Sequence, residues 1–469
     1  MMSELIVKFK FKSLLLFLFS ISAFAQKREI LTLEQYIDQV RRFHPVAKQA
    51  GIIIEKADAD LLSAKGGFDP VFEMELDNKT LDGVKYYRYN DASLKIPTPF
   101  GVEFKAGYEK ISGEYLNPEL TKGLLNYLGF ELPLLKGLLI DKRRATLQQA
   151  KVLQRQSAQE RFLVLNDLLF DAHQTYWQWA AAYELVTVYK NFYETARQRN
   201  ELVKVLFRNG DRAMADTVEA FTQVQQIELL QNEANLKYLN ASLELSQFLW
   251  TQDQKAYLLP TSLLPDSIAF QQIKSLPVLN ELVENVAGNH PQVLFYQFKL
   301  QDLEVERKLK FQSLLPTLNL KTNLLSKNYS QFRDFESTYL AENYKLGFNF
   351  KMPILLRQGR GEYQKMQLKV QETNLQMVDK TWQLANKIRQ YYNEATMLNN
   401  QIQTTKAMTD NVLFLLKNEN LKFAQGESAL FLINSRENKV LEMKQKQIEL
   451  QQKYQKAAIA IEWANGQLR

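Results

Sequence analysis

Histidine and cysteine are the side chains most often used in metal binding and nucleophilic catalysis, and this chain has three histidines and no cysteine. The absence of cysteine excludes disulfides, thiol catalysis, thiolate metal sites and a lipid-modified N-terminal cysteine. His44 and His290 each precede a proline, in the position of a helix N-cap. His173 lies inside a long helical pattern. We therefore predict packing or capping roles for the histidines, and no metal or cofactor.

Two further motifs could bind anions. The Gly-Arg-Gly triplet at 359–361 lacks the length and the Lys-Ser/Thr pair of a phosphate loop, and we expect it to join a strand to a helix. The Asp-Lys-Arg-Arg run at 141–144 opens a long helix, where Asp suits the helix dipole and the basic residues do not. A solvated or lipid-headgroup-facing role remains open for this run. Because no nucleophile is paired with a base, we predict that the chain is not an enzyme.

The first 25 residues have the pattern of a secretory signal peptide. Three lysines precede an apolar run at 14–24, which ends in Ala-Phe-Ala at 23–25. Eleven apolar residues are too few to span a bilayer. Removal of residues 1–25 takes away three lysines and one glutamate, so the net charge falls from +7 to +5. This small excess on an exported chain argues against a nucleic-acid partner.

Beyond residue 25 the apolar residues fit strands better than membrane helices. The longest candidate span, 123–140, is interrupted by Glu131, Pro133 and Lys136. Apolar and polar residues alternate within 71–76, 102–106 and 317–321. The strands of a membrane β-barrel need only about ten such residues each. We therefore predict strands at about 70–133 and about 316–353, with an additional hairpin around the turn at 97–101.

The chain contains the same landmarks twice in one order. His44-Pro45 and Pro70 recur at an offset of 246 residues, Pro133 recurs at 220, and Phe207 with Gly210 recurs at 216. The offset changes mainly between Pro70 and Pro133. A duplicated unit with a longer first copy explains the pattern. We expect a first repeat at 26–250, a linker at 251–277 and a second repeat at 278–469.

Long helices explain why the chain has only 17 Gly and 12 Pro. Apolar residues recur at coiled-coil spacing from 162 to 186, inside a predicted helix at about 139–208. A second helix is predicted at about 361–425. Some 65 helical residues measure about 100 Å, so both helices need long partners. Shorter helices are expected at about 213–250 and about 429–464.

Three segments carry a resemblance to a known family: Leu-Gly-Phe-Glu-Leu-Pro-Leu-Leu-Lys-Gly at 128–137, Phe-Arg-Asn-Gly-Asp-Arg-Ala at 207–213 and Phe-Ala-Gln-Gly-Glu-Ser-Ala at 423–429. Together with the signal peptide and the duplicated unit, their order resembles the TolC family of outer-membrane efflux proteins over nearly the whole mature chain. The resemblance implies an α+β, mainly α fold. Long coiled-coil helices would form an α-helical tunnel in the periplasm, and strands from each subunit of a homotrimer would close one transmembrane β-barrel.

The resemblance also implies a place and partners. The chain would lie in the outer membrane of a Gram-negative bacterium, in contact with outer-membrane lipid, a periplasmic adaptor (membrane fusion) protein and an inner-membrane efflux or secretion transporter. The few strands predicted for one chain cannot close a membrane barrel, and an open sheet edge in lipid leaves backbone groups without hydrogen bonds. The strand count therefore supports a barrel shared between subunits, independently of the resemblance. The alternative is an exported periplasmic or surface coiled-coil scaffold or adhesin without a pore.

The two helix turns provide the candidate site residues. Gly210 and Gly426 end the long helices, and the aromatic residues Phe207 and Phe423 stand three positions earlier. The resemblance places the tunnel constriction and the adaptor contacts at this end. Ordinary core packing is the alternative for the two phenylalanines.

Acidic residues at the turns are the candidates for a cation-attracting ring. The family often has them six and nine positions after the second glycine, where this chain has Leu432 and Ser435. The corresponding positions of the first half hold Asp216 and Glu219. We therefore predict that an acidic ring would come from the first turn, with a solvated helix face as the alternative.

Overall fold

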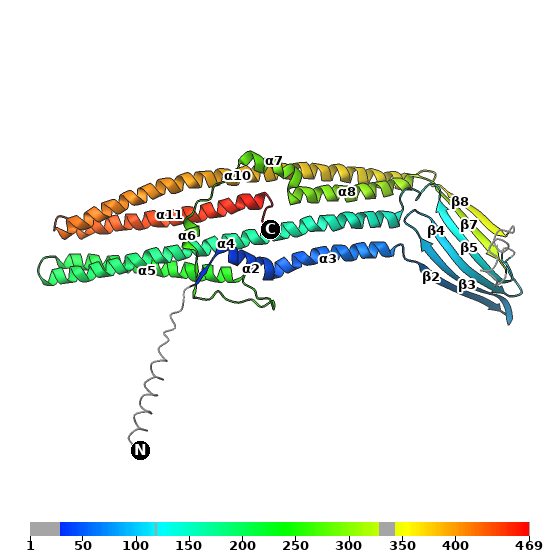
Figure 1. The fold of residues 1–469 in the computed structure, drawn as a ribbon, viewed down its shortest axis with the longest axis horizontal. Coiled ribbons are helices and arrows are strands. Elements are labelled where there is room, and N and C mark those ends of the chain that lie inside the picture. The colour runs from blue at the N-terminus through cyan, green and yellow to red at the C-terminus, as the bar shows by residue number, and fades with distance from the viewer. Residues whose placement is uncertain (1–28, 118–119, 328–342, 469) are drawn as a thin grey trace, which may run out of the picture. The chain divides into compact units, whose positions relative to one another are not determined.

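The computed structural model describes residues 29–117, 120–327 and 343–468 (Figure 1). The predicted signal peptide at 1–25 lies outside the described residues. The chain is mainly helical with one large antiparallel sheet, which agrees with the predicted α+β, mainly α class. Across the described ranges, none of the helices has a stretch apolar enough to cross a lipid bilayer.

The element order is similar in the two halves of the sequence. The first half contains α2 (Leu33–Phe43), α3 (Pro45–Gly66), β2 (Val71–Leu81), β3 (Val84–Pro97), β4 (Glu103–Ser112), β5 (Gly123–Pro133), α4 (Lys142–Arg208) and α5 (Met214–Ser246). The second half contains α7 (Leu279–Asn289), α8 (Pro291–Phe311), β7 (Thr317–Ser326), β8 (Tyr344–Lys351), α10 (Arg357–Ala424) and α11 (Leu430–Ala464). The first half therefore has four strands where the described part of the second has two.

The additional strands of the first half are joined by a tight turn. β3 and β4 pair up to Pro97 and Glu103, and the Thr98 N–H donates to the Val102 carbonyl at 3.0 Å. Gly101 has a φ of 89°, a left-handed conformation that glycine adopts without steric cost. The turn that the Pro-Thr-Pro-Phe-Gly sequence predicts at 97–101 therefore joins two neighbouring strands of the sheet.

The chain divides into two compact units, each drawn from both halves of the sequence. One unit contains the part up to Pro45, Leu169–Ser275 and Asn393–Ile459. The other contains Val46–Leu168, Leu276–Tyr392 and Ala460 onwards. We call them the helical unit and the sheet unit, and describe each by itself.

In the helical unit, α4, α5 and α11 share a core. Its buried residues are Tyr189 and Ala196 of α4, Val224, Ile227 and Ala234 of α5, and Leu441 of α11. The heptad positions predicted within this part of α4 are buried at Leu169, Ala172, Tyr176 and Trp179. The seam predicted from the sequence therefore provides much of the packing of α4.

The segment between the two halves is held against the same helices. β1 (Glu29–Leu31) pairs in parallel with β6 (Leu263–Pro265), which is followed by α6 (Ser267–Gln271). The Tyr176 hydroxyl donates to the Leu31 carbonyl at 2.7 Å, and the Gln455 amide donates to the Gln272 carbonyl at 2.8 Å. These bonds satisfy one carbonyl of β1 and one carbonyl just after α6.

The histidines have packing and capping roles. The His290 ring caps α8, since its Nδ1 accepts from the Gln292 N–H at 3.1 Å while Nε2 lies 3.1 Å from the Ala464 carbonyl. His173 is buried in α4 with Nδ1 2.6 Å from the Leu169 carbonyl. Burial lowers the pKa of each of these histidines to about 4. His44 stands at the C-cap of α2, and its ring stacks on Phe248.

In the sheet unit, six strands form one antiparallel sheet in the order β2-β3-β4-β5-β7-β8. β5 joins the two halves of the sequence through its pairing with β7, which runs from Asn126–Ser326 to Pro133–Asn319. Among the described residues, β2 and β8 are the edge strands. The sheet is open at both edges.

Candidate functional site

The two turns between the long and the shorter helices have the same backbone structure. Gly210 ends α4 with a φ of 82°, and Gly426 ends α10 with a φ of 81°. At each turn the glycine N–H donates to the carbonyl three residues earlier, and the next N–H donates to the carbonyl five residues earlier. This pattern is the Schellman motif, which satisfies the last carbonyls of a helix.

The two aromatic candidates have different environments. Phe423 packs on Val203, Ala220 and Leu430, and the Arg212 guanidinium lies 4.4 Å from its ring centroid. Phe207, by contrast, is 41% exposed. The Phe423 ring therefore packs the turns of α4–α5 and α10–α11 together, whereas much of the Phe207 ring is exposed.

The acidic candidates are also unequal. Asp216 is half-buried in the first turn of α5, where a carboxylate suits the helix dipole. Glu219 accepts a hydrogen bond at 3.3 Å from the Asn434 amide of α11. On α11, Leu432 and Ser435 are exposed. Glu219 is thus held by a hydrogen bond within the chain, and Asp216 is the acidic candidate at the start of α5.

One face of the sheet is apolar from edge to edge. The register connects Phe72, Leu94, Ala106, Leu128, Leu324 and Tyr344 in a single row across the six strands. Paired residues point to the same side of a sheet. On edge strand β8, Leu346, Phe348 and Phe350 continue this face and are exposed. A water-soluble sheet would not expose so large a continuous apolar surface.

The opposite face is charged and internally paired. Glu131 of β5 is central: its carboxylate lies 3.4 Å from the ammonium groups of both Lys105 and Lys321. Glu103 accepts from the Arg143 guanidinium at 3.0 Å. The Tyr127 hydroxyl donates to Asp91 at 3.0 Å. One side of the sheet therefore suits lipid and the other suits water.

No protein-family model and no curated protein sequence matches the chain. Among solved structures, it is similar to the CmeC outer membrane channel of Campylobacter jejuni, with 15% sequence identity over 93% of this chain and 86% of that chain, and a TM-score of 0.65. It is similar to CusC, with 13% identity over 95% of each chain and a TM-score of 0.67. It is also similar to the MtrE outer membrane channel of Neisseria gonorrhoeae, with 12% identity over 93% of this chain and 89% of that chain, and a TM-score of 0.65.

This chain has the fold of the outer-membrane channels. The α+β, mainly α fold that the resemblance to the TolC family implies for one chain is thereby confirmed over more than nine-tenths of its length, and the barrel shared by a homotrimer stays a prediction. Within one copy of the described chain, the six-stranded sheet of this fold ends in unpaired edge strands. The neighbouring structures are themselves channels of the outer membrane.

A buried ion pair near the helix turns was missed by the sequence analysis. Arg199 of α4 donates to both carboxylate oxygens of Glu437 of α11, at 2.9 and 2.6 Å. Gln223 of α5 donates to the same carboxylate at 3.3 Å. The available signal was spacing, because Arg199 stands eleven residues before Gly210 and Glu437 eleven residues after Gly426. Equal distances from the two turns place the charges at the same level of neighbouring helices.

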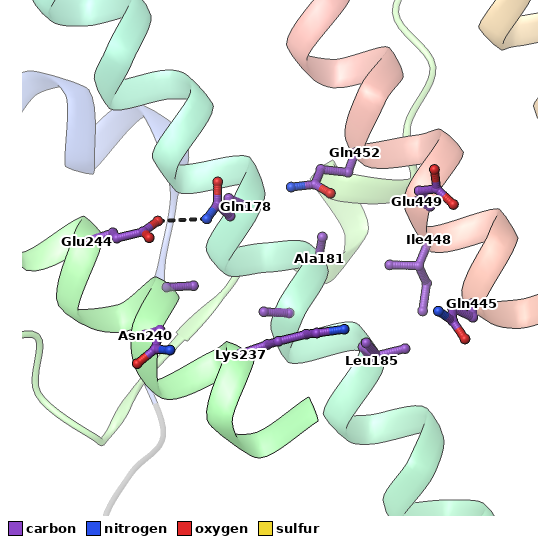
Figure 2. A pocket seen from close by; sticks show the side chains of 12 residues that line it. Gln178, Ala181, Leu185, Lys237, Asn240, Glu244, Gln445, Ile448, Glu449 and Gln452 are labelled. Atoms are coloured by element: carbon purple, nitrogen blue, oxygen red, sulfur yellow. Dashed lines mark hydrogen bonds between the residues drawn. The ribbon is translucent and has the colours of Figure 1, made fainter. Parts of the chain in front are cut away.

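The helical unit of the channel fold also has an open hollow of about 420 Å³ between α4, α5 and α11 (Figure 2). Ala181 and Ile448 are among its apolar lining residues, and Lys237 extends across it. At its rim the Gln178 amide donates to Glu244 at 2.6 Å. Within the described residues, no group of three or more acidic or histidine side chains could hold a metal ion. The hollow has the character of a groove between helices rather than of a catalytic cleft.

Proposed function

We propose that the chain is the outer-membrane channel of an export system, and that three copies complete it. Six strands per copy would close into one barrel, with the apolar face toward lipid and the charged face toward a water-filled lumen. The long helices of the three copies would pack together as a tunnel in the periplasm. Exported solutes would then pass without energy input from this protein, which we infer is not an enzyme.

The observation that carries this proposal is the two-faced sheet with open edges. The row from Phe72 to Tyr344 is apolar on all six strands, while Lys105, Glu131 and Lys321 pair on the other side. An edge strand in lipid leaves its N–H and C=O groups unsatisfied. Pairing of β8 from one copy with β2 of the next would satisfy them. A scaffold or adhesin without a pore has no use for this apolar face.

The helix turns are the proposed meeting point with the export machinery. Phe207 and the backbone around Gly210 and Gly426 would contact a periplasmic adaptor, which connects to an inner-membrane pump. Exposed Leu432 and Ser435 line the second turn, and Asp216 with Glu219 line the first. The tunnel constriction is proposed at the same end. The exposed Phe207 ring supports adaptor contact together with exposed Val205 and Met214 on either side of the same turn, because clusters of exposed apolar residues mark binding surfaces.

Cross-linking between edge strands tests the shared barrel. Because the chain has no native cysteine, only the introduced cysteines can react. Phe72→Cys in β2 and Phe350→Cys in β8 would be combined in one chain and treated with a short bis-maleimide in outer membranes. We expect dimers and trimers and no larger species, because the ring closes at three copies. Each single variant is the control and should give no trimer. Absence of covalent oligomers in the double variant would contradict the proposal.

A further inference from the structure

Three loops leave the helix-side end of the sheet and expose apolar side chains to an unusual extent. They are 98–102 after β3, 134–141 after β5 and 352–356 after β8. Phe100 is 83% exposed, Leu139 is 81% exposed and Ile354 is 92% exposed. The register places all three loops at the same end, since Pro97 pairs with Glu103, Pro133 with Asn319, and Lys351 with Thr317.

These loops are held in place, so their exposed side chains are not explained by loose chain ends. The Gly137 N–H donates to the Gln312 side chain at 3.0 Å, and the Arg144 guanidinium donates to the Leu138 carbonyl at 2.9 Å. Ile140, next to Leu139, is buried. In the third loop, Leu356 has a φ of 49°, a conformation that a non-glycine residue rarely adopts. Local hydrogen bonds and the burial of Ile140 thus hold the second loop with Leu139 exposed.

Basic residues accompany the apolar ones. Lys136 lies within the second loop and Lys142 follows it, while Arg357 and Arg360 follow the third; all four are exposed. Asp141 is the one acidic residue of the three loops, and its carboxylate accepts from Arg144 at 3.2 Å. The surface is therefore apolar and positively charged. Apolar tips with neighbouring lysine and arginine suit the boundary between hydrocarbon and anionic phosphate groups.

We propose that the three loops form an interfacial anchor that inserts Phe100, Leu139 and Ile354 into the phospholipid leaflet on the helix side of the barrel, with Lys136, Lys142, Arg357 and Arg360 on the lipid phosphates. The proposal rests on the proposed function, because the three loops extend the proposed lipid-facing side of the sheet at its helix-side end. Repeated in three copies, the anchor would fix the depth and tilt of the channel. A chain without an acylated cysteine gains membrane attachment beyond the barrel in this way.

Single-cysteine labelling tests the anchor. Phe100→Cys, Leu139→Cys and Ile354→Cys would each be labelled with an environment-sensitive fluorophore in the full-length channel, reconstituted in vesicles of phosphatidylethanolamine and phosphatidylglycerol. We expect a blue shift of the emission, loss of fluorescence with nitroxide-labelled phospholipid, and protection from aqueous iodide. Nitroxide near the headgroup should quench more than nitroxide near the chain end.

Two reference labels separate this proposal from the proposed function. Phe348→Cys reports the apolar sheet face, and Leu239→Cys reports an exposed leucine of α5 in the helical unit. Lipid quenching at Phe348 with iodide quenching at all three loop positions would overturn the anchor and leave the barrel intact. Iodide quenching at Phe348 itself would overturn the barrel, and the anchor with it. Lipid quenching at the loops and at Phe348, but not at Leu239, is the result we expect.

Discussion

Arg199 of α4 and Glu437 of α11 form a bidentate ion pair, and Glu437 is only 1% exposed. The planar guanidinium matches both carboxylate oxygens, and the Asn434 side chain accepts a further bond from Arg199 at 3.3 Å. Asn434 in turn donates to Glu219. A chain of polar contacts therefore ties α4, α5 and α11 together just behind the two helix turns.

We expect Glu437→Gln to destabilise the helical unit by about 3–5 kcal/mol, because it leaves a buried guanidinium without its counter-charge. The measurement is thermal unfolding in detergent, followed by the helical circular dichroism signal. Glu442→Gln on the same helix is the matched control. Glu442 pairs with Lys439 at 2.8 Å on the surface, so its loss should cost only about 0–1 kcal/mol. Equal effects of the two substitutions would show that the buried pair has no special role.

Acid should weaken the fold through two buried histidines. The fold favours the neutral form of His173 and His290, since burial lowers each pKa from 6.5 to about 4. Their contribution is complete above pH about 6.5 and is lost as the pH falls toward 4, at about 3 kcal/mol for each histidine. We expect the unfolding temperature to fall between pH 7 and pH 5, before most carboxylates titrate.

The variant His290→Asn tests the histidine contribution. Asparagine keeps a side-chain oxygen that can cap α8, but it does not titrate. The fall in unfolding temperature between pH 7 and pH 5 should therefore be clearly smaller in this variant than in the wild type. An unchanged pH dependence would assign the acid sensitivity to other groups.

The first helix turn should set cation preference if its acids face the lumen. Asp216→Asn is expected to lower the cation-to-anion permeability ratio, because it would remove one negative charge from each copy at the proposed constriction of the tunnel. Glu219→Gln is expected to have a smaller effect on the ratio, since the structure holds Glu219 to Asn434. Reversal potentials across a salt gradient give the ratio. If neither variant changes it, the acidic-ring hypothesis is wrong.

The two faces of β8 should differ in their tolerance of charge. Phe348→Asp places a carboxylate on the apolar face, where a charge facing lipid destabilises the barrel; near the bilayer midplane Lys or Arg costs about 2–4 kcal/mol and a carboxylate less. Asn349→Asp, one residue later, places the same group on the polar face. We expect poor folding into vesicles for the first variant and near-normal folding for the second. Comparable folding yields would contradict a lipid-facing assignment for Phe348.

Periodic and local features of the fold could be predicted from the sequence. The heptad spacing through Leu169, Tyr176 and Trp179 marked a helix seam, and these residues are buried. Gly210 and Gly426 marked helix ends because the left-handed conformation there favours glycine. Alternation separated the two faces of the strands. Each of these features depends on neighbours along the chain.

Features that depend on tertiary contacts were less predictable. The equivalent positions of Phe207 and Phe423 suggested equivalent roles, but Arg212 and the Val203 cluster engage Phe423 alone. The Arg199–Glu437 pair required knowing which helices lie side by side. The number of strands in 70–133 depended on a turn at 97–101 whose place in the sheet only the pairing of β3 with β4 shows. Long-range pairing thus separates what was predicted from what was not.

Single-channel recording in planar lipid bilayers tests the channel proposal most directly. The purified full-length protein, shown to be folded by its helical circular dichroism signal, would be added to one side of the membrane. We predict long-lived unitary current steps from trimers, because in the proposed assembly three six-stranded sheets would close around a water-filled lumen. A folded protein that remains monomeric in detergent and gives no current steps would contradict the proposal that this chain forms an outer-membrane channel.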